Sequence, residues 1–439
     1  MGTSFSIIVV VIISLVFSSR FNTFTQWVFH RLGRKTLQQH PHLLSVEDHR
    51  DIADFSILGK DVGLVDKLTA RAVPNHRLVK AFAIANSFTT TDTTIHNEFV
   101  TSVDRALDHL ETAQHSVNLA CLARVYCLGV ILNVLFGKDP QTFDIDDAVV
   151  ASDAINRLWV DSKDVSRPVS PKDQAQLQDS LRRLLPDSYS DVPEKQPLNL
   201  IMPAYETMWR IVLQTYISAG FRAPDQTTAQ HFQEVVQSVP QCFGNQSMKY
   251  QEDKALAFSK EALRLYPPTK RIHRAVPQDR DSNPDSPQPC NRGSTYATVS
   301  ADVEACHRDP SQWGRDALAF CPSRFSTRRW PDDPSHTPAR PPREAYMPFG
   351  VGKHMCPAGP GTGFANRVVV ILAVTLAKRL GTGGSGAAVV GLDGDVGRLL
   401  PSGREDMEGW VLEMNVDVEG DDGDGKRGRG SGEERGGQL

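Results

Sequence analysis

The stretch that most constrains this chain is residues 349–358, which read FGVGKHMCPA. It places Cys356 after a loop whose glycines, Gly350 and Gly352, let the backbone turn tightly and approach a bulky group closely. An apolar run follows at residues 367–380 and has the length and residue types of a buried helix. Because the amino end of a helix favours negative charge, this arrangement favours a thiolate at Cys356. The pattern predicts a cysteine offered to a metal.

The kind of metal site follows from the spacing of the cysteines. No second cysteine stands at C-x-x-C spacing from Cys356, so the pattern is not typical of a zinc or iron–sulfur site. Haem iron is therefore the leading candidate. The alternative is a surface turn with a buried free cysteine. The seven cysteines are scattered and odd in number, which suits a reducing compartment better than a disulfide framework.

The composition sets outer limits on fold and partners. The chain has 439 residues and 40% hydrophobic content, enough for one large domain or two ordinary ones. Its formal net charge of −4 is small for this size and argues against a nucleic-acid partner, which would normally meet a basic surface.

The cysteine loop resembles the haem-binding loop of the cytochrome P-450 superfamily, whose pattern is Phe-x-x-Gly-x-Arg/His-x-Cys-x-Gly/Ala. The residues that fill it here are Phe349, Gly352, His354, Cys356 and Ala358. The resemblance implies that Cys356 is the axial ligand of haem iron and that Phe349 packs near it. Gly350 belongs to the same cofactor-binding loop, and His354 stands where the family usually has a cation that binds a haem propionate.

A second match lies in residues 199–219, which are long and apolar enough for a core helix yet contain Pro203, Glu206 and Thr207. Proline inside a helix removes a hydrogen bond and kinks it. The stretch resembles the family's helix on the oxygen-binding face of the haem, with pattern Ala/Gly-Gly-x-Asp/Glu-Thr. The resemblance implies that Glu206 and Thr207 are catalytic and relay protons to dioxygen. The alternative is a helix start with an acidic first turn.

A third match is a set of charged residues. Glu261 and Arg264 are three apart in a helix predicted over residues 256–266, so they share a face and can pair. They resemble the family's Glu-x-x-Arg helix, and Arg324 in a Pro-x-Arg-Phe segment supplies the family's third member. The resemblance implies a structural clamp rather than a reacting group. It also implies that Arg274, on a predicted strand, reaches a haem propionate.

The remaining predictions concern domain organisation. Residues 1–19 carry no charge and are just long enough to cross a bilayer, which predicts an N-terminal membrane anchor; a cleaved signal peptide is the alternative. Residues 20–70 are interpreted as a linker and a poorly patterned region, residues 71–414 as the haem-thiolate catalytic domain, and residues 415–439 as a disordered tail rich in glycine and charge. Helices are predicted over residues 98–137 and 173–185.

Together these patterns predict a mainly α fold with small β-sheets (α+β), similar to the cytochrome P-450 fold in a complete or shortened form. The resemblance, which is to fungal, membrane-anchored members, implies a haem b monooxygenase of secondary metabolism that inserts one oxygen atom into an apolar small molecule. Its electrons would come from NADPH through a flavoprotein reductase. It would sit at the endoplasmic reticulum membrane with its catalytic domain in the cytosol. The alternatives are an oxygen-independent haem-thiolate isomerase or dehydratase, and a non-catalytic, truncated family member.

Overall fold

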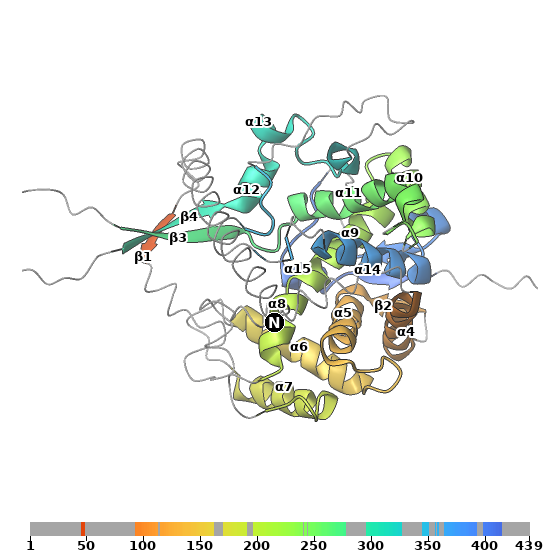
Figure 1. Ribbon diagram of the computed structural model, residues 1–439, viewed down its shortest axis with the longest axis vertical. Coiled ribbons are helices and arrows are strands. Elements are labelled where there is room, and N and C mark those ends of the chain that lie inside the picture. The colour runs from red at the N-terminus through yellow and green to blue at the C-terminus, as the bar shows by residue number, and fades with distance from the viewer. Residues whose placement is uncertain are drawn as a thin grey trace, which may run out of the picture.

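Three apolar helices form the centre of the fold. Helix α9 (Met208–Gly220) packs against both α5 (Leu119–Phe136) and α14 (Phe364–Leu380) (Figure 1). Side chains from α5 and α9, among them Tyr126 and Trp209, are fully enclosed. Because apolar side chains surround most of α5, it is stabilised by burial on nearly all of its faces.

The structure is a computed structural model, and it describes residues 45–48, 93–112, 115–161, 170–190, 196–239, 241–243, 245–277, 296–326, 345–350, 356, 358–359, 364–392 and 398–414. The other helices are α4 (Thr93–Leu110), α6 (Ile145–Asp161), α7 (Pro171–Leu184), α8 (Leu198–Tyr205), α10 (Gln226–Ser238), α11 (Lys249–Leu265), α12 (Val303–Arg308), α13 (Pro310–Trp313) and α15 (Arg404–Met407). The strands are β1 (Ser45–Asp48), β2 (Ser116–Asn118), β3 (Arg271–Pro277), β4 (Tyr296–Asp302), β5 (Ala388–Val390) and β6 (Val411–Glu413).

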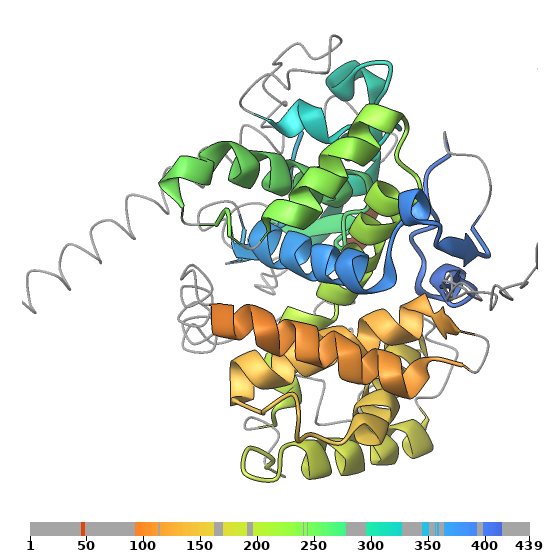
Figure 2. The same cartoon turned by 90° about the vertical axis from the view of Figure 1, so that its right-hand side faces the viewer.

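The longer helices form two groups. Helices α4, α5, α6 and α7 lie together in the lower half of Figure 2, while α9, α10, α11 and α14 lie above them. Helix α7 begins at Pro171 with Ser170 as its N-cap, whose side chain accepts a hydrogen bond from the Asp173 amide at 3.2 Å. The predicted helix over residues 173–185 is confirmed, with its start two residues earlier.

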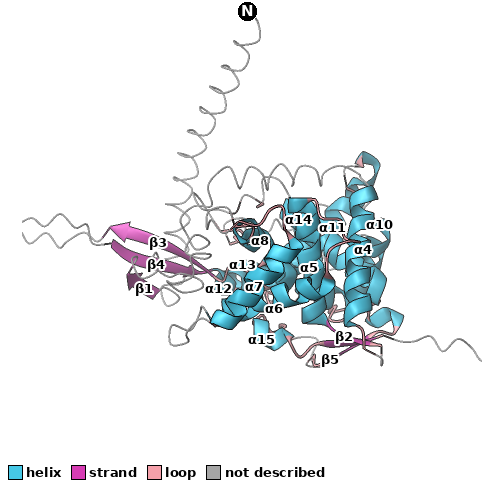
Figure 3. Ribbon diagram, turned by 90° about the horizontal axis from the view of Figure 1, so that it is seen from below, coloured by secondary structure: helices cyan, strands magenta, loops and turns pink. Residues whose placement is uncertain are grey.

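Two small antiparallel sheets complete the fold (Figure 3). The first has the order β1-β4-β3 and projects to one side of the helices. The second has the order β2-β6-β5 and pairs residues far apart in sequence, with Val117 opposite Leu412. The prediction of a mainly α fold with small β-sheets is confirmed. Strand β1 lies within residues 20–70, where the sequence pattern predicted no element.

The prediction of one helix over residues 98–137 is wrong. Helix α4 ends at Leu110, and strand β2 separates it from α5. His115 takes the left-handed conformation with φ of 53°, and Asn118 is extended and caps α5 by accepting a hydrogen bond from the Cys121 amide at 2.8 Å. The break follows from pairing between β2 and β6, which local periodicity cannot reveal.

Within the part of the chain that the structure describes, two helical stretches are long and apolar enough to cross a membrane, α5 and residues 365–385, but 72% and 67% of their apolar windows are buried inside the protein. Since both pack among other helices, we interpret them as core helices. The predicted membrane anchor at residues 1–19 and the predicted tail at residues 415–439 lie outside the described residues, as does all of the region 20–70 except β1.

Asn118 is expected to contribute more to stability than an ordinary helix cap. Besides capping α5, its Nδ2 donates to the Glu408 carbonyl at 2.7 Å and so ties the helix start to the C-terminal segment. Asn118→Ala should lower the free energy of unfolding by about 1–2 kcal/mol. Urea titration followed by circular dichroism measures this change.

The matched control is Asn245→Ala. Asn245 makes the same kind of cap, accepting from the Ser247 amide at 3.0 Å, on a short exposed turn. It should cost less than about 0.5 kcal/mol. Equal losses in the two variants would contradict the tethering role of Asn118.

Candidate functional site

The backbone around Cys356 forms a closed turn. The Cys356 amide donates to the Phe349 carbonyl at 2.8 Å, and the Gly359 amide donates to the Cys356 carbonyl at 3.0 Å. Gly350 has a φ of 71°, a conformation that favours glycine, and its amide donates to the Met347 carbonyl at 3.0 Å. The turn therefore fixes the position of Cys356 relative to residues 347–350. Gly352 and His354 lie outside the described residues.

Gly359 is a site residue that the sequence analysis missed. A Cβ atom at this position would lie 2.8 Å from the Cys356 carbonyl oxygen and 3.2 Å from the Phe349 Cβ. Any larger residue would therefore push the cysteine turn away from Phe349. The signal available in the sequence was a glycine three residues after Cys356, directly before a glycine-rich step.

The Cys356 side chain is a free thiol, and the residue is exposed. Enough protein surrounds the sulfur for burial to raise the pKa of the thiol above its ordinary value, while a hydrogen bond from the Ala358 backbone acts in the opposite direction. Among the described residues, no group of three or more His, Cys, Asp or Glu side chains could hold a metal. Within the described residues, the site therefore offers one sulfur, with a backbone donor beside it, as a potential metal ligand.

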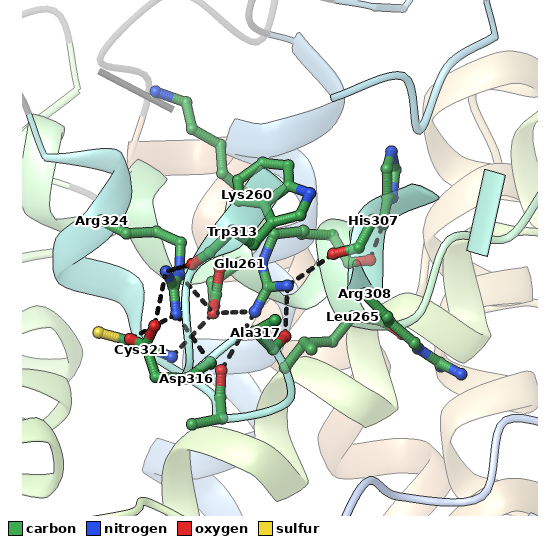
Figure 4. A network of polar contacts seen from close by, with 12 residues as sticks. Lys260, Glu261, Leu265, His307, Arg308, Trp313, Asp316, Ala317, Cys321 and Arg324 are labelled. Atoms are coloured by element: carbon green, nitrogen blue, oxygen red, sulfur yellow. Dashed lines mark hydrogen bonds and ion pairs between the residues drawn. The ribbon is translucent and has the colours of Figure 1, made fainter. Parts of the chain in front are cut away.

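The charged residues predicted to form a clamp lie together in the structure. Glu261 and Arg264 are both fully buried on α11, and their side chains are joined by two hydrogen bonds of 2.8 and 2.7 Å. The remaining guanidinium donors of Arg264 bind backbone carbonyls of His307, Ala317 and Ala319 at 2.7, 2.6 and 3.1 Å (Figure 4). A buried ion pair is stable only when its donors are satisfied in this way.

Arg324 approaches the same carboxylate from the segment that follows α13. Its Nε lies 3.3 Å from Glu261 Oε1, and its other nitrogens bind the Trp313 carbonyl at 3.0 Å and the Asp316 carboxylate at 2.8 Å. The Cys321 amide also donates to Glu261, at 2.8 Å. Figure 4 shows these groups converging on Glu261. The clamp therefore joins α11 to the chain segment 313–324.

His307, on α12, is a second residue whose role the sequence did not reveal. Its ring is fully buried, with Nδ1 3.0 Å from the Arg264 carbonyl and Nε2 2.8 Å from the Met347 amide. Burial, together with nearby Arg264 and Arg308, lowers the pKa of His307 to about 3, although the hydrogen bond to the Arg264 carbonyl acts against this. The ring is thus neutral at pH 7 and links the clamp helix to the segment before Phe349.

Glu206 and Thr207 lie where the predicted helix over residues 199–219 is interrupted. Helix α8 ends at Tyr205, two residues after Pro203, and α9 begins at Met208. Both Glu206 and Thr207 keep right-handed helical dihedral angles, and the Glu206 amide still donates to the Met202 carbonyl at 3.0 Å. The junction is therefore a two-residue interruption with helical backbone angles and not an extended loop.

The Glu206 carboxylate is buried between two arginines. Arg210 lies 3.6 Å away on α9, and Arg404 on α15 forms a direct ion pair with it. Burial lowers the pKa of Arg210 to about 10 and that of Arg404 to about 9, so both stay charged at neutral pH. In the described part of the chain, no hydrogen bond or ion pair joins Glu206 to the turn around Cys356.

Arg404 belongs to a larger, partly buried charge cluster, which we call the C-terminal charge cluster. The cluster contains Arg124, Asp153, Asn156, Glu206, Arg210, Arg404 and Glu408. The Arg404 guanidinium lies near the rings of Trp159 and Trp209, at 5.1 and 5.7 Å from their centroids. The sequence signal was Arg124, a lone charge within the apolar run of α5.

Arg274 lies on β3 with Val299 opposite it on β4, and its side chain lies outside the described residues. The structure thus brings together the clamp residues, and separately Phe349, Gly350 and Cys356. It places Glu206 in the C-terminal charge cluster.

Comparison with known proteins identifies part of the chain. Residues 230–378 match the family model described as Cytochrome P450. This region contains the clamp residues and Cys356, whereas Glu206 and Thr207 precede it. Among solved structures, the chain is similar to a six-coordinated cytochrome P450 from Thermus thermophilus, with a TM-score of 0.46 and 17% identity over 86% of this chain and 90% of that chain.

Three curated proteins are similar over a shorter stretch. Cytochrome P450 714C2 of Oryza sativa subsp. japonica is 34% identical over 119 residues, which are 27% of this chain and 20% of that protein. Germacrene A hydroxylase of Tanacetum parthenium and amorpha-4,11-diene 12-monooxygenase of Artemisia annua are each 33% identical over 111 residues, or 24% of this chain and 19% of theirs. The chain thus spans 19–20% of the length of these relatives.

The clamp is expected to be essential to stability. Glu261→Gln removes the charge that balances Arg264, which is fully buried, and should lower the free energy of unfolding by about 3 kcal/mol or more. The control is Asp316→Asn, which breaks the pair of Arg324 with a carboxylate whose side chain is 53% exposed. It should cost less than about 1 kcal/mol. Urea unfolding of the two variants compares them, and similar losses would contradict a special role for the buried pair.

The buried, neutral His307 is expected to make the folded protein less stable in acid. Because the native ring has a pKa of about 3 and an unfolded histidine one of about 6.5, the unfolded chain binds the extra proton between these values. The stability that comes from keeping His307 neutral is fully present above pH 6.5 and is lost as the pH falls toward 3. Lowering the pH from 7 to 5 should reduce the free energy of unfolding by roughly 2 kcal/mol through His307 alone.

The measurement compares urea unfolding of the wild type and His307→Gln at pH 7 and pH 5. Subtraction removes the effect of the carboxylates common to both proteins. The variant, which cannot be protonated at residue 307, should lose less stability than the wild type on acidification. A difference between the proteins that does not change with pH would contradict a neutral, buried His307.

Proposed function

Because residues 230–378 make this chain a member of the cytochrome P450 superfamily, we propose that it is a haem-thiolate monooxygenase with Cys356 as the axial ligand. The observation that carries the proposal is the free thiol of Cys356 in a closed turn, with a backbone hydrogen bond from Ala358 directed at its sulfur. Such a turn holds one sulfur in a fixed place for one metal.

Haem iron, when bound, would supply oxygen activation, which no side chain provides. The chain's own contribution is to hold the sulfur. The Cys356 thiol, whose pKa is raised by burial, would lose its proton on coordinating the metal. Phe349 packs against the hydrophobic core and, with Gly359, fixes the turn. We assign Arg274 and His354 to the haem propionates on the family resemblance.

The proposed substrate is an apolar small molecule. Two similar proteins are named as a hydroxylase of germacrene A and as a 12-monooxygenase of amorpha-4,11-diene. Their names support oxygen insertion into a hydrocarbon, and on the same resemblance we propose that electrons come from NADPH through a flavoprotein reductase. The proposed location is the endoplasmic reticulum membrane, with residues 1–19 as the anchor.

The position of Glu206 favours a second candidate. A carboxylate that transfers protons must exchange them, yet the Glu206 carboxylate is buried, forms an ion pair with Arg404 and lies 3.6 Å from the guanidinium of Arg210. An oxygen-independent haem-thiolate isomerase or dehydratase needs no proton delivery to dioxygen. The Thr207 hydroxyl is compatible with both candidate functions and does not distinguish them. The need for NADPH and dioxygen therefore decides between them.

The thiolate site is tested by replacing Cys356. The reduced wild-type protein should show a strongly red-shifted Soret band with carbon monoxide, since only a thiolate ligand shifts the band in this way. Cys356→Ala should lose that band completely. The control is Cys321→Ala, another free cysteine, which should keep it because Cys321 meets the clamp through its backbone amide.

Turnover with a purified flavoprotein reductase completes the test. NADPH oxidation coupled to oxygen uptake in the wild type supports the monooxygenase. A red-shifted band combined with conversion of an oxygenated lipid in the absence of NADPH would support the second candidate. Failure of the wild type to give the band would contradict both candidates and leave a non-catalytic family member.

A further inference from the structure

His307 makes two hydrogen bonds to two different parts of the chain. It lies on α12 and is fully buried. One ring nitrogen is 3.0 Å from the carbonyl of Arg264, near the end of α11, and the other is 2.8 Å from the amide of Met347. The ring therefore bridges the clamp helix and the segment that leads into the cysteine turn.

The chemistry of the two partners fixes the state of the ring. The Met347 amide can only donate, so Nε2 accepts, and the Arg264 carbonyl can only accept, so Nδ1 donates its hydrogen. One neutral tautomer satisfies both bonds. A protonated ring would set two N–H groups against each other at Met347.

The bridge continues to the sulfur through the backbone. The Met347 carbonyl accepts a hydrogen bond from Gly350 at 3.0 Å, and the Phe349 carbonyl accepts one from Cys356 at 2.8 Å. Displacement of Met347 would thus be passed to the residues that hold the Cys356 amide.

Side-chain packing holds the same segment against α11 and α12. The Tyr346 ring stacks on His307, with centroids 5.7 Å apart and an angle of 21° between the planes. Its hydroxyl donates to the Lys260 carbonyl at 3.3 Å. Stacking holds the Tyr346 side chain beside the ring, whereas His307 Nε2 accepts a hydrogen bond from the Met347 amide.

We propose that His307 is a positioning residue for Cys356. Through Met347, His307 transmits the fixed position of the Glu261–Arg264 clamp to the cysteine turn. The inference rests on the proposed function for its meaning in haem ligation, because the thiolate would have to stay in place when a bulky group binds against it. Its structural part, the control of the turn by His307, can be measured without haem.

The first experiment uses the full haem-free chain and amide hydrogen exchange. His307→Leu should raise the exchange rates of the Met347, Gly350 and Cys356 amides by about tenfold or more. It removes the buried hydrogen bond between His307 and the Met347 amide, which holds the segment that carries the other two bonds. His307→Gln, whose amide can donate and accept, should restore most of the protection. The control Tyr346→Phe removes only the hydrogen bond to Lys260 and should leave the Met347 amide protected.

The second experiment adds haem and records the reduced, carbon monoxide-bound spectrum of each protein. Relative to the wild type, His307→Leu should lose at least about half of the red-shifted, thiolate-type Soret band in favour of the band of a neutral ligand. His307→Gln and Tyr346→Phe should keep it. A role confined to filling the core would predict instead that total haem content falls without a change in the ratio of the two bands.

The outcomes separate this inference from the proposed function. Unchanged exchange at Met347 in His307→Leu, or equal acceleration of amides in α5 and in the turn, would overturn the positioning role. If His307→Leu does not fold, His307→Phe, which also lacks both ring nitrogens, replaces it: lower Met347 protection in His307→Phe than in His307→Gln supports the role, and equal protection in the two variants overturns it. A wild type without the thiolate band contradicts the proposed function, while the exchange result still decides whether His307 holds the turn.

Discussion

The buried ion pair of Glu261 and Arg264 is the interaction on which the site depends. Removing two charges from water is costly, and the pair is stable because further hydrogen bonds satisfy both side chains. Glu261 also accepts from the Cys321 amide and Arg324, and Arg264 donates to three carbonyls. These bonds reach α11, α12 and the segment 313–324. Polar contacts of this kind are directional, so they fix the elements relative to one another more strictly than apolar packing does.

A second set of charges, in which the arginines are buried and two of the acids are partly exposed, stabilises the region around the start of α9. Arg124 and Arg404 both lie near the Trp209 ring, at 5.6 and 5.7 Å from its centroid, and their acidic partners come from α6, the α8–α9 junction and the residue that follows α15. Charge therefore fixes the helical core in two separate places. Glu206 belongs to the second set through Arg404, which gives its carboxylate a structural partner that the family resemblance did not imply.

The sequence predicted what local spacing determines. Glu261 and Arg264 share a helical face because they are three residues apart, and the turn at Cys356 could be inferred from its glycines. It did not predict the break between α4 and α5, because β2 exists only through its partner β6 nearly at the other end of the chain. The roles of Arg404 and His307 were missed for the same reason, because each acts through a residue far away in sequence. Gly359 was missed because the need for glycine arises only in the folded turn, where a Cβ atom would meet the Cys356 carbonyl oxygen and the Phe349 side chain.

The salt bridge of Arg124 with Glu408 has a consequence for how the protein is made. The two residues are 284 positions apart, so α5 leaves the ribosome long before its counter-charge has been synthesised. Until then, Asp153 is the acidic partner of Arg124 that is already available. An arginine in the middle of an apolar helix resists burial while its charge is incompletely balanced. Vectorial synthesis therefore leaves the closing of this core to the last folding step, in which the C-terminal segment docks.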